Sequence, residues 1–507
     1  MPHSTACPAP ARIHALFDQR LAQSPQQVFM HTPEGDVDFA TLGGWVERLA
    51  DELRAHGVQE GDRVLAVAEN CPEHVALILA CSRVGAWSCG VNARMARGEV
   101  EAFVQKADPR LVYFTRTASE AAAGHARQAQ AVPSVLPGLS RSLARAQAVP
   151  EPAPLAQQVA AVIFTSGTTG APKGVLVSHE GLLQFARVSS TSRALGPQDR
   201  SYAYVPMTHI FGLATVLMAS LYAGASLVMR THFDPADLFD ALAHHGVSNL
   251  QGPPAMYTRL LAWLDAQGMA HPQAPALRYI YTGAAPLDLA LKRAVEARFG
   301  QVLHHGYGLS EYAGALALVP RGSRREDTSA GYLVEGGELR IVDAQGQDVP
   351  LGERGEIWMR GVGLMPGYFR DPESTAQVMR PGGWYASGDL GRQDADGAVY
   401  VVGRLKEMII RSGFNVYPGE VESVLTQFPR IQRAAVVGRK QADGNEEVLA
   451  FVETVGRQPL DEGALKAYLT DQLAPYKRPS RVIVVEALPM THSGKILKRS
   501  LLEQIPA

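Results

Sequence analysis

The stretch Phe164-Thr-Ser-Gly-Thr-Thr-Gly-Ala-Pro-Lys-Gly174 is the part of this sequence that decides the fold. It carries four hydroxyl side chains, three glycines and Lys173. The apolar residues 159–163 precede it and predict a buried strand. Glycine lets a backbone approach a ligand, and successive N–H groups can hold an anion. The stretch therefore predicts a loop that binds nucleotide phosphates, with a plain Gly/Thr turn as the alternative.

Two better-known phosphate loops do not fit this sequence. A Walker A loop reads G-x-x-x-x-G-K-[ST], whereas here Pro172 precedes Lys173 and Gly174 follows it. The glycines of residues 361–367 do not form G-x-G-x-x-G, so there is no dinucleotide fingerprint. A kinase or another ATP-dependent enzyme stays an alternative class, although its motifs are missing.

Bulk composition is that of a globular chain with several cores. The sequence has 507 residues, of which 46% are apolar and 19% charged, and its formal net charge is −2. No whole-chain field favours nucleic acid or an anionic membrane. No apolar run approaches the roughly 18 residues that suggest a spanning helix, and the N-terminus does not resemble a signal peptide.

The cysteines are few and show no C-x-x-C spacing, which argues against a disulfide framework and a zinc site. We expect buried free thiols in a reducing cytoplasm. The adjacent pairs His244-His245 and His304-His305 do not face one metal on a regular element, although one of the second pair is expected near the acyl pocket described below. The four cysteines are Cys7, Cys71, Cys81 and Cys89.

Alternating strands and helices predict an α/β fold with parallel or mixed sheets covered by helices. Residues 118–157 lack periodicity and are interpreted as a surface connection. Short strands with Gly-rich turns at 331–365 predict a small β-rich subdomain. Residues 404–507 predict a compact, mobile α+β domain. We expect an N-terminal domain over 1–403 and a C-terminal domain over 404–507.

Eight stretches, in order, are similar to the motif set of the adenylate-forming (AMP-binding) superfamily, of the acyl-CoA synthetase or aryl-CoA ligase type. The resemblance covers essentially the whole chain. It includes Gly306-Tyr-Gly-Leu-Ser-Glu311 and Tyr385-Ala-Ser-Gly-Asp389. The eight stretches are residues 164–174, 206–209, 282–286, 306–311, 385–391, 403–407, 411–420 and 489–499.

The resemblance implies a nucleotide site that takes ATP and Mg²⁺. The phosphate loop would hold the β- and γ-phosphates, Tyr307 would stack on adenine, and Asp389 would accept from the ribose hydroxyls. Glu311 would hold Mg²⁺, and Arg404 would contact the ribose or phosphate. The implied ATP/AMP-binding residues are Thr165, Ser166, Gly167, Thr168, Thr169, Gly170, Lys173, Gly283, Ala284, Ala285, Tyr307, Asp389 and Arg404.

The resemblance also implies an acyl pocket beside this site. His209 would lie near the substrate carboxylate or gate the pocket, with a packed aromatic as the alternative, and Ser310 would touch the phosphate or carboxylate. The small and apolar lining suits an aromatic, alicyclic or medium-chain acid. We expect no arginine or lysine in the pocket for a second carboxylate, with Arg230 left open. The implied lining is Phe211, Thr215, Tyr281, Ala284, Gly306, Gly308, Gly314, Ala315 and Leu316.

The C-terminal motifs imply a hinge at Lys406, a thiol path at Ser412, Gly413 and Phe414, and a catalytic Lys495. The implied reaction joins a carboxylate to AMP and then transfers the acyl group to CoA. A free-standing carrier protein as acceptor and a non-catalytic nucleotide-binding relative remain alternatives; with the chain ending at Ala507, no fused carrier is expected. A homodimer is also kept open.

Overall fold

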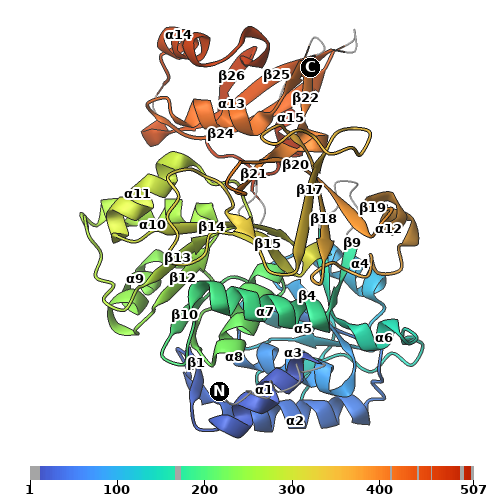
Figure 1. Cartoon of the computed structure of the whole chain (residues 1–507). Helices are drawn as coiled ribbons and strands as arrows, with labels where there is room; N and C mark the ends of the chain where they lie inside the picture. Colours follow the sequence, from blue (N-terminus) through green and yellow to red (C-terminus); the bar gives the residue numbers. More distant parts are fainter. Residues whose placement is uncertain are drawn as a thin grey trace, which may run out of the picture.

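A computed structural model of the chain describes residues 12–165, 173–411, 414–441, 445–457, 459–490 and 496–503. The larger part of the molecule carries the N-terminus, and a smaller lobe carries the C-terminus above it (Figure 1). The predicted α/β fold with two unequal parts is confirmed.

A seven-stranded sheet in the order β6-β7-β5-β3-β4-β8-β9 forms one side of the larger part. Alternate residues of β3 serve different cores: Val64 and Ala66 face the main one, while Leu65 and Val67 face a second. This sheet is therefore buried on both faces, as its unbroken apolar strands predict. The strands are β3 Arg63–Ala68, β4 Trp87–Asn92, β5 Leu111–Phe114, β6 Val132–Pro133, β7 Ser140–Arg141, β8 Val159–Thr165 and β9 Lys173–Ser178.

A nine-stranded sheet in the order β16-β15-β14-β13-β12-β10-β11-β1-β2 forms the other side. Strands β10 to β14 run parallel, and β15 and β16 continue them antiparallel. The strands are β1 Val28–Thr32, β2 Gly35–Asp38, β10 Arg200–Ala203, β11 Ser226–Met229, β12 Asn249–Gly252, β13 Tyr279–Thr282, β14 Leu303–Leu309, β15 Gly314–Leu318 and β16 Tyr332–Leu333.

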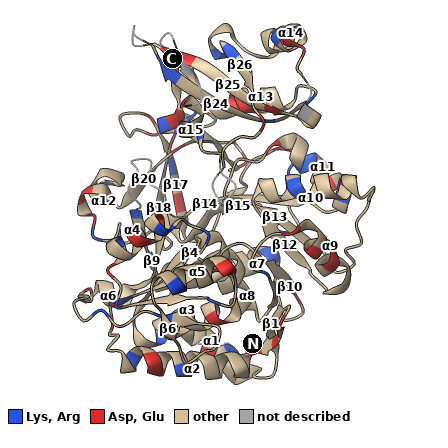
Figure 2. Ribbon diagram, turned by 180° about the vertical axis from the view of Figure 1, so that it is seen from behind, with Lys and Arg blue, Asp and Glu red and all other residues tan. Residues whose placement is uncertain are grey.

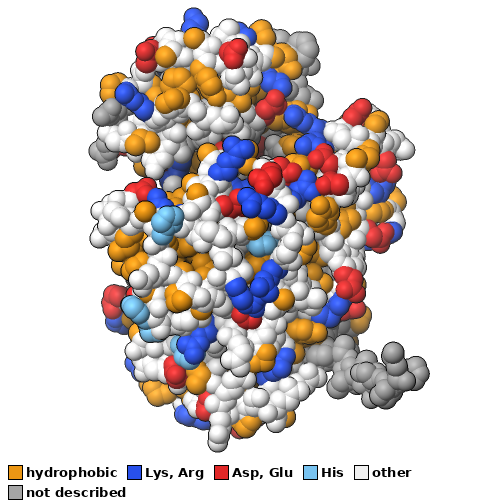
Figure 3. Space-filling model, turned by 60° about the vertical axis from the view of Figure 1, so that its left-hand side comes forward, with side chains coloured by type: hydrophobic (Ala, Val, Ile, Leu, Met, Phe, Trp, Pro, Cys, Tyr) orange, Lys and Arg blue, Asp and Glu red, His pale blue; other side chains and the backbone are white. Residues whose placement is uncertain are grey.

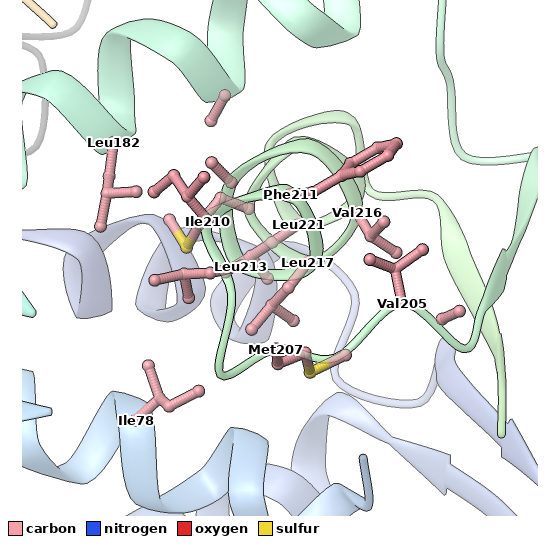
Figure 4. Packing of buried hydrophobic residues seen from close by; sticks show 14 of the residues in the cluster. Ile78, Leu182, Val205, Met207, Ile210, Phe211, Leu213, Val216, Leu217 and Leu221 are labelled. Carbon is pink, nitrogen blue, oxygen red and sulfur yellow. The ribbon is translucent and has the colours of Figure 1, made fainter. Parts of the chain in front are cut away.

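Helices pack around both sheets, and one core cluster joins the two. Apolar side chains surround the segment η1 Phe211–Met218 on all sides (Figure 4). Lys and Arg residues and Asp and Glu residues are interspersed along the ribbon, and neither sign is gathered in one region (Figure 2). The helices are α1 Ile13–Gln23, α2 Phe39–Ala55, α3 Pro72–Val84, α4 Arg97–Ala107, α5 Glu120–Gln128, α6 Leu155–Gln158, α7 His179–Arg193, α8 Ala219–Ala223, α9 Pro235–His244, α10 Pro254–Ala266 and α11 Leu289–Phe299.

The predicted β-rich subdomain is a five-stranded sheet, and the C-terminal lobe is the predicted α+β unit. In the lobe, β25 pairs with β24 antiparallel and with β26 parallel. The remaining elements are β17 Gly337–Val342, β18 Gly355–Gly361, α12 Pro372–Val378, β19 Met379–Arg380, β20 Trp384–Gln393, β21 Val399–Arg404, β22 Ile409–Arg411, β23 Phe414–Val416, α13 Pro418–Thr426, β24 Ile431–Lys440, β25 Glu446–Thr454, α14 Glu462–Gln472, β26 Arg481–Val484 and α15 Lys498–Leu502.

The prediction for residues 118–157 is wrong in part, because this connection holds helix α5 and the short strands β6 and β7. Ser119 caps α5 by accepting a hydrogen bond from the Ala122 amide at 3.2 Å. Ala122 and Ala126 form its buried face, which is too small to give a strong apolar periodicity. Among the described helices, none is long and apolar enough to cross a membrane.

Candidate active site

The phosphate-loop stretch joins two antiparallel strands, β8 and β9. Thr165 pairs with Lys173 at the end of this hairpin that adjoins the connecting loop. The ammonium of Lys173 lies 4.8 Å from the centre of the Tyr368 ring. The Gly174 carbonyl accepts from the Phe369 amide at 2.7 Å. The C-terminal end of the loop is therefore anchored to residues 368–369, and its N-terminal end is held by strand pairing with Lys173. The predicted phosphate ligands Ser166, Gly167, Thr168, Thr169 and Gly170 lie outside the described residues.

Glu311 lies in a short 3-10 turn, Ser310–Tyr312, directly after β14. The Tyr368 hydroxyl donates to its Oε1 at 3.1 Å, and the Tyr385 hydroxyl lies 3.3 Å from that of Tyr368. Burial raises the pKa of Glu311 above its ordinary value. The structure thus presents one desolvated carboxylate beside the end of β14, with Ser310 buried next to it.

Asp389 links three separate motifs. Its Oδ2 accepts from the Tyr307 hydroxyl at 2.6 Å, and its Oδ1 lies 3.1 Å from Nε of Arg404. The Ser387 hydroxyl accepts from the Asp389 amide at 3.0 Å and donates to the Ile357 carbonyl at 2.6 Å, which fixes the turn. The Asp389 carboxylate raises the pKa of Arg404, and burial with that carboxylate raises the pKa of Tyr307. Tyr307 and Arg404, which were predicted to contact the adenine and the ribose or phosphate, thus both contact the carboxylate of Asp389, the predicted ribose ligand.

The predicted adenine loop follows the end of β13. Ala284 has a φ of +66°, a conformation that side chains other than glycine rarely adopt. A Cβ on Gly283 would lie 3.2 Å from the Tyr281 hydroxyl. The backbone of residues 283–285 is therefore held in a tight turn beside Tyr281, as a loop that approaches a flat ligand requires.

His209 lies at the entrance to η1, a π-helix. Its Nδ1 accepts from the Phe211 amide at 3.2 Å, which favours the tautomer with the ring proton on Nε2. Turns of π-helix are rare and are frequent at functional sites. The sequence did not predict this helix, because its all-round apolar composition carries no periodicity.

A small, partly open cavity lies beside this helix. It contains two predicted acyl-pocket residues, Thr215 and Tyr281, and the ring of a third, Phe211, packs edge-on at 5.9 Å from the Tyr281 ring. The full lining is Phe185, Ser189, Ser192, Arg193, Thr215, Tyr279, Tyr281 and Leu318.

The predicted glycines pack closely against one another and against the cavity residues Tyr281 and Phe185. A Cβ on Gly306 would lie 2.2 Å from the Tyr281 hydroxyl, and one on Gly308 would lie 2.1 Å from the Gly314 carbonyl oxygen. A Cβ on Gly314 would meet the Phe185 ring at 2.4 Å. These positions therefore need glycine. Ala315 instead lines a neighbouring cavity that shares Phe185.

Arg193 in the cavity wall corrects the expectation that no arginine or lysine lies there. No local signal marked it, because an arginine at the last turn of a helix is ordinarily solvent-exposed. Arg230, the residue left open, forms an ion pair with Asp237 at 2.7 Å. His304 stacks on Tyr279 with the ring centres 4.3 Å apart, on the face of the sheet that carries Tyr281.

Contacts between the larger part and the C-terminal lobe involve α13. Nη1 of Arg354 lies 3.2 Å from Oε2 of Glu420, and the Thr426 hydroxyl donates to Oδ2 of Asp288 at 3.3 Å. A hollow lies between the two parts (Figure 3). Lys406 lies in the exposed 3-10 turn Leu405–Glu407, and Phe414 begins β23. Ser412, Gly413 and Lys495 lie outside the described residues.

Comparisons with known proteins assign the family. Residues 17–369 match the AMP-binding enzyme profile, and residues 420–495 match the profile of the AMP-binding enzyme C-terminal domain. The chain is 34% identical to an indoleacetate–CoA ligase of Aromatoleum aromaticum, over 95% of this chain and 96% of that one. It is 32% identical to a feruloyl-CoA synthase of an Amycolatopsis species, over 95% and 96% of the two chains.

Among solved structures, ATP-bound MatB from Rhodopseudomonas palustris superposes with a TM-score of 0.83 at 30% identity, over 97% of this chain and 98% of that one. The apo form of the same protein superposes with a TM-score of 0.77. The fold is thus that of an adenylate-forming enzyme. The chain belongs to the AMP-binding enzyme family, and the resemblance stated from its motifs is confirmed.

Proposed function

We propose that this protein is an ATP-dependent, AMP-forming acid–CoA ligase. The observation that carries the proposal is the meeting of Tyr307, Asp389 and Arg404 at one end of β14, with Glu311 at the same end and the acyl cavity beside it. The relatives named above are a CoA ligase and a CoA synthase, which supports the same reaction type.

The first step activates the acid. A carboxylate oxygen attacks the α-phosphorus of ATP, the bond between the α-phosphorus and its bridging oxygen breaks, and pyrophosphate leaves. In this proposal the phosphate loop and Lys173 hold the departing phosphates. Asp389 accepts hydrogen bonds from the ribose hydroxyls, and Arg404 balances the charge of Asp389. Lys495 supplies a positive charge at the α-phosphate, where charge develops.

The residues present fit a magnesium ion held jointly with the substrate. Glu311 offers one carboxylate, and the described residues contain no group of three His, Cys, Asp or Glu side chains that could hold a metal alone. Magnesium is commonly bound by one or two carboxylates together with phosphate oxygens. Bound there, it would neutralise phosphate charge as a Lewis acid. Burial raises the pKa of Glu311 by disfavouring its charge. A cation bound beside Glu311 would favour the charged carboxylate and offset that effect.

His209 is proposed as a donor at the reacting carboxylate, because its Nδ1 is occupied by the Phe211 amide and its Nε2 carries the proton. Ser310, buried beside Glu311, is proposed to touch the same carboxylate or the α-phosphate. Neither residue needs to change its charge. Both would orient the acid for in-line attack.

The second step is proposed to follow a rotation of a C-terminal domain, residues 404–507, about Lys406. The end of β21 at Arg404 and the gap between the two family profiles support this boundary. The rotation would withdraw Lys495 and bring Ser412, Gly413 and Phe414 to the thiol path. The CoA sulfur then attacks the acyl carbon, its proton passes to solvent, and AMP leaves.

The acid is proposed to be aromatic. The rings of Phe185, Tyr279 and Tyr281 line the cavity, and such walls suit a flat ring. Indoleacetate and ferulate, in the names of the relatives, are aromatic acids. Alicyclic and medium-chain acids are the alternatives.

Acid-dependent exchange of labelled pyrophosphate into ATP, followed by CoA addition, tests the function. We expect exchange only with an added acid and acyl-CoA only with CoA. Exchange without CoA consumption, but with acylation of a carrier protein, would favour the carrier-loading alternative. No exchange with any acid, despite ATP binding, would replace the enzyme proposal by the non-catalytic one.

We further propose a cytoplasmic location and a homodimer. The described cysteines Cys71, Cys81 and Cys89 are free, which suits a reducing compartment. Fractionation of cells and sedimentation of the purified protein measure the two properties directly. A secreted protein or a concentration-independent monomer would contradict them.

A further inference from the structure

Arg193 is a buried cation whose described partners are all neutral. Its side chain lies at the cavity wall, and the residue is 2% exposed. Nε donates to the Ser189 carbonyl at 2.9 Å, Nη1 to Oε1 of Gln251 at 2.8 Å, and Nη2 to the Ser189 hydroxyl at 2.7 Å and the Thr215 carbonyl at 2.6 Å. Burial of a charge without a counter-ion is costly.

The nearest candidate counter-ion is committed elsewhere. Oδ1 of Asp199 accepts from Nε of Arg278 at 2.7 Å and from the Ser248 hydroxyl at 2.7 Å, and no ion pair joins it to Arg193 among the described contacts. Asp199 therefore compensates Arg278. Arg193 at the cavity wall therefore has no directly bonded counter-ion among the described residues, and the Asp199 charge acts on it only from beyond hydrogen-bond reach.

Gln251 is a buried side chain with a donor that has no partner among the described atoms. The residue is fully buried, its Oε1 is occupied by Arg193, and its Nε2 has no hydrogen-bond partner among the described atoms. Gln251 pairs with Tyr281 in the register of β12 and β13, so it lies on the cavity face of the sheet. Because the amide oxygen is taken, this side chain can offer only N–H groups, and an unpartnered buried amide is rare.

Tyr281 connects this region to the reacting end of the site. Its hydroxyl lies beside the backbone of Gly283 and Gly306, while its ring lines the cavity with Arg193. The rings of Tyr279 and Tyr281 are parallel within 11° and 6.4 Å apart. A flat acid lying along these rings would therefore carry its reacting carboxylate at the Gly306 end and its far end toward Arg193.

We propose that Arg193 and Gln251 form a subsite for an anionic oxygen group, such as a second carboxylate, at the far end of the acid. The proposal rests on the proposed function. The two side chains present donors, so they select an acceptor, and the uncompensated guanidinium selects a negatively charged one. Acids with a methyl group at the far end would leave the Arg193 charge without a counter-ion and the Gln251 amide nitrogen without a partner.

Matched pairs of aromatic acids test the subsite. Each pair differs only in the para substituent, carboxylate against methyl, and two lengths are used, benzoates and cinnamates. We expect the wild-type kcat/KM for adenylation to be about 10- to 100-fold higher for the carboxylate member of at least one pair. In Arg193→Met and in Gln251→Leu, this preference should fall to within about threefold of unity, with the methyl acid little affected.

Arg187→Met is the matched control. Arg187 lies on the same helix, α7, but is partly exposed and pairs with Glu335 at 2.9 Å, so its loss removes a charge without touching the cavity. Its substrate preference should equal that of the wild type. If Arg193→Met does not fold, Gln251→Leu carries the test, because it removes only a neutral amide.

The outcomes separate this inference from the function it rests on. Equal kcat/KM within every pair, or a preference that survives both cavity variants, would overturn the subsite while leaving the ligase in place. In that case Arg193 would serve only the packing of α7. Absence of exchange with every acid, methyl members included, would overturn both proposals.

Discussion

The two ends of the candidate site are built on different principles. At the nucleotide end, the polar groups bond to one another: Tyr307 and Arg404 meet Asp389, and Tyr368 meets Glu311. At the acyl end, aromatic rings surround a cavity, and the one buried cation there has neutral partners only. Among the described residues, the charged groups of the first end are thus paired with one another, whereas at the second end the Gln251 amide nitrogen has no partner.

This difference teaches where specificity resides. ATP is common to every member of such a family, so its ligands can be fixed in advance by a closed network. The acid differs between members, so its site depends on cavity shape and on donors that only the right substrate satisfies. Changes at the nucleotide end should therefore alter the rate with every acid, and changes at the acyl end should alter the choice among acids.

The largest expected effect is at the nucleotide end. Lys495→Ala should lower the adenylation rate by about 100- to 1000-fold with every acid, because one well-placed donor at a developing charge contributes about 3 kcal/mol. Transfer from preformed acyl-AMP to CoA should continue at nearly the wild-type rate. Single-turnover measurements of the two half-reactions provide the test.

Lys466→Ala, which changes an exposed lysine on α14 of the same lobe, is the control and should leave both half-reactions unchanged. Equal losses of Lys495→Ala in both half-reactions would contradict the alternation of the lobe between two positions. An acid-dependent loss would contradict the division between the two ends of the site.

Gly306→Ala tests the point where the two ends meet. The new Cβ would lie 2.2 Å from the Tyr281 hydroxyl, so the ring must shift toward the cavity that it lines. Overpacking of this kind costs about 1–3 kcal/mol, and we expect kcat/KM to fall about tenfold for cinnamates but less for small acids such as acetate. Gly44→Ala, at a helical position with open space around it, should change neither value. A uniform fall across acids of all sizes would place Gly306 at the nucleotide end.

The sequence carries more local signal for the nucleotide end than for the acyl end, for a physical reason. Phosphate, ribose and metal ligands lie in short loops after strands, so local residue types indicate them. Strand β8 was also predicted, because residues 159–163 form one apolar run. Arg193 and Gln251 are 58 residues apart and meet only through packing between α7 and β12. By contrast, α5 was missed although Ser119 offered a cap, because alanines gave it little periodicity.

A smaller effect is expected where the lobe contacts the larger part. Arg354 pairs with Glu420 and lies 5.0 Å from the centre of the Tyr417 ring. We propose that this arrangement serves the first step, because the chain superposes better with ATP-bound MatB than with the apo form. A partly exposed pair contributes about 0.2–1 kcal/mol, so Arg354→Ala should lower adenylation relative to thioester formation by about two- to fivefold.

The ratio of the two half-reaction rates measures this effect, and raised salt should diminish it by screening the pair. Arg324→Ala, which removes an exposed arginine paired with Glu326, is the control. A ratio that moves in the opposite direction would assign the Arg354–Glu420 contact to the thioester-forming arrangement. The acyl cavity itself should be untouched, so acid preference should stay constant.

The smallest expected effect is on stability and concerns Glu311. Its folded-state pKa lies above the ordinary value of 4.5, because burial disfavours the charge. As pH rises through the window from about 4.5 to that raised pKa, the unfolded state loses its proton first, so the free energy of unfolding decreases. Glu311→Gln removes this loss and keeps an oxygen for the Tyr368 hydroxyl. Its melting temperature at pH 7.5 should exceed that of the wild type by on the order of 1 °C. The excess should shrink as the pH approaches 4.5 and when the wild type is saturated with MgATP. A variant less stable than the wild type at pH 7.5 would mean that the Glu311 carboxylate is already compensated inside the nucleotide network.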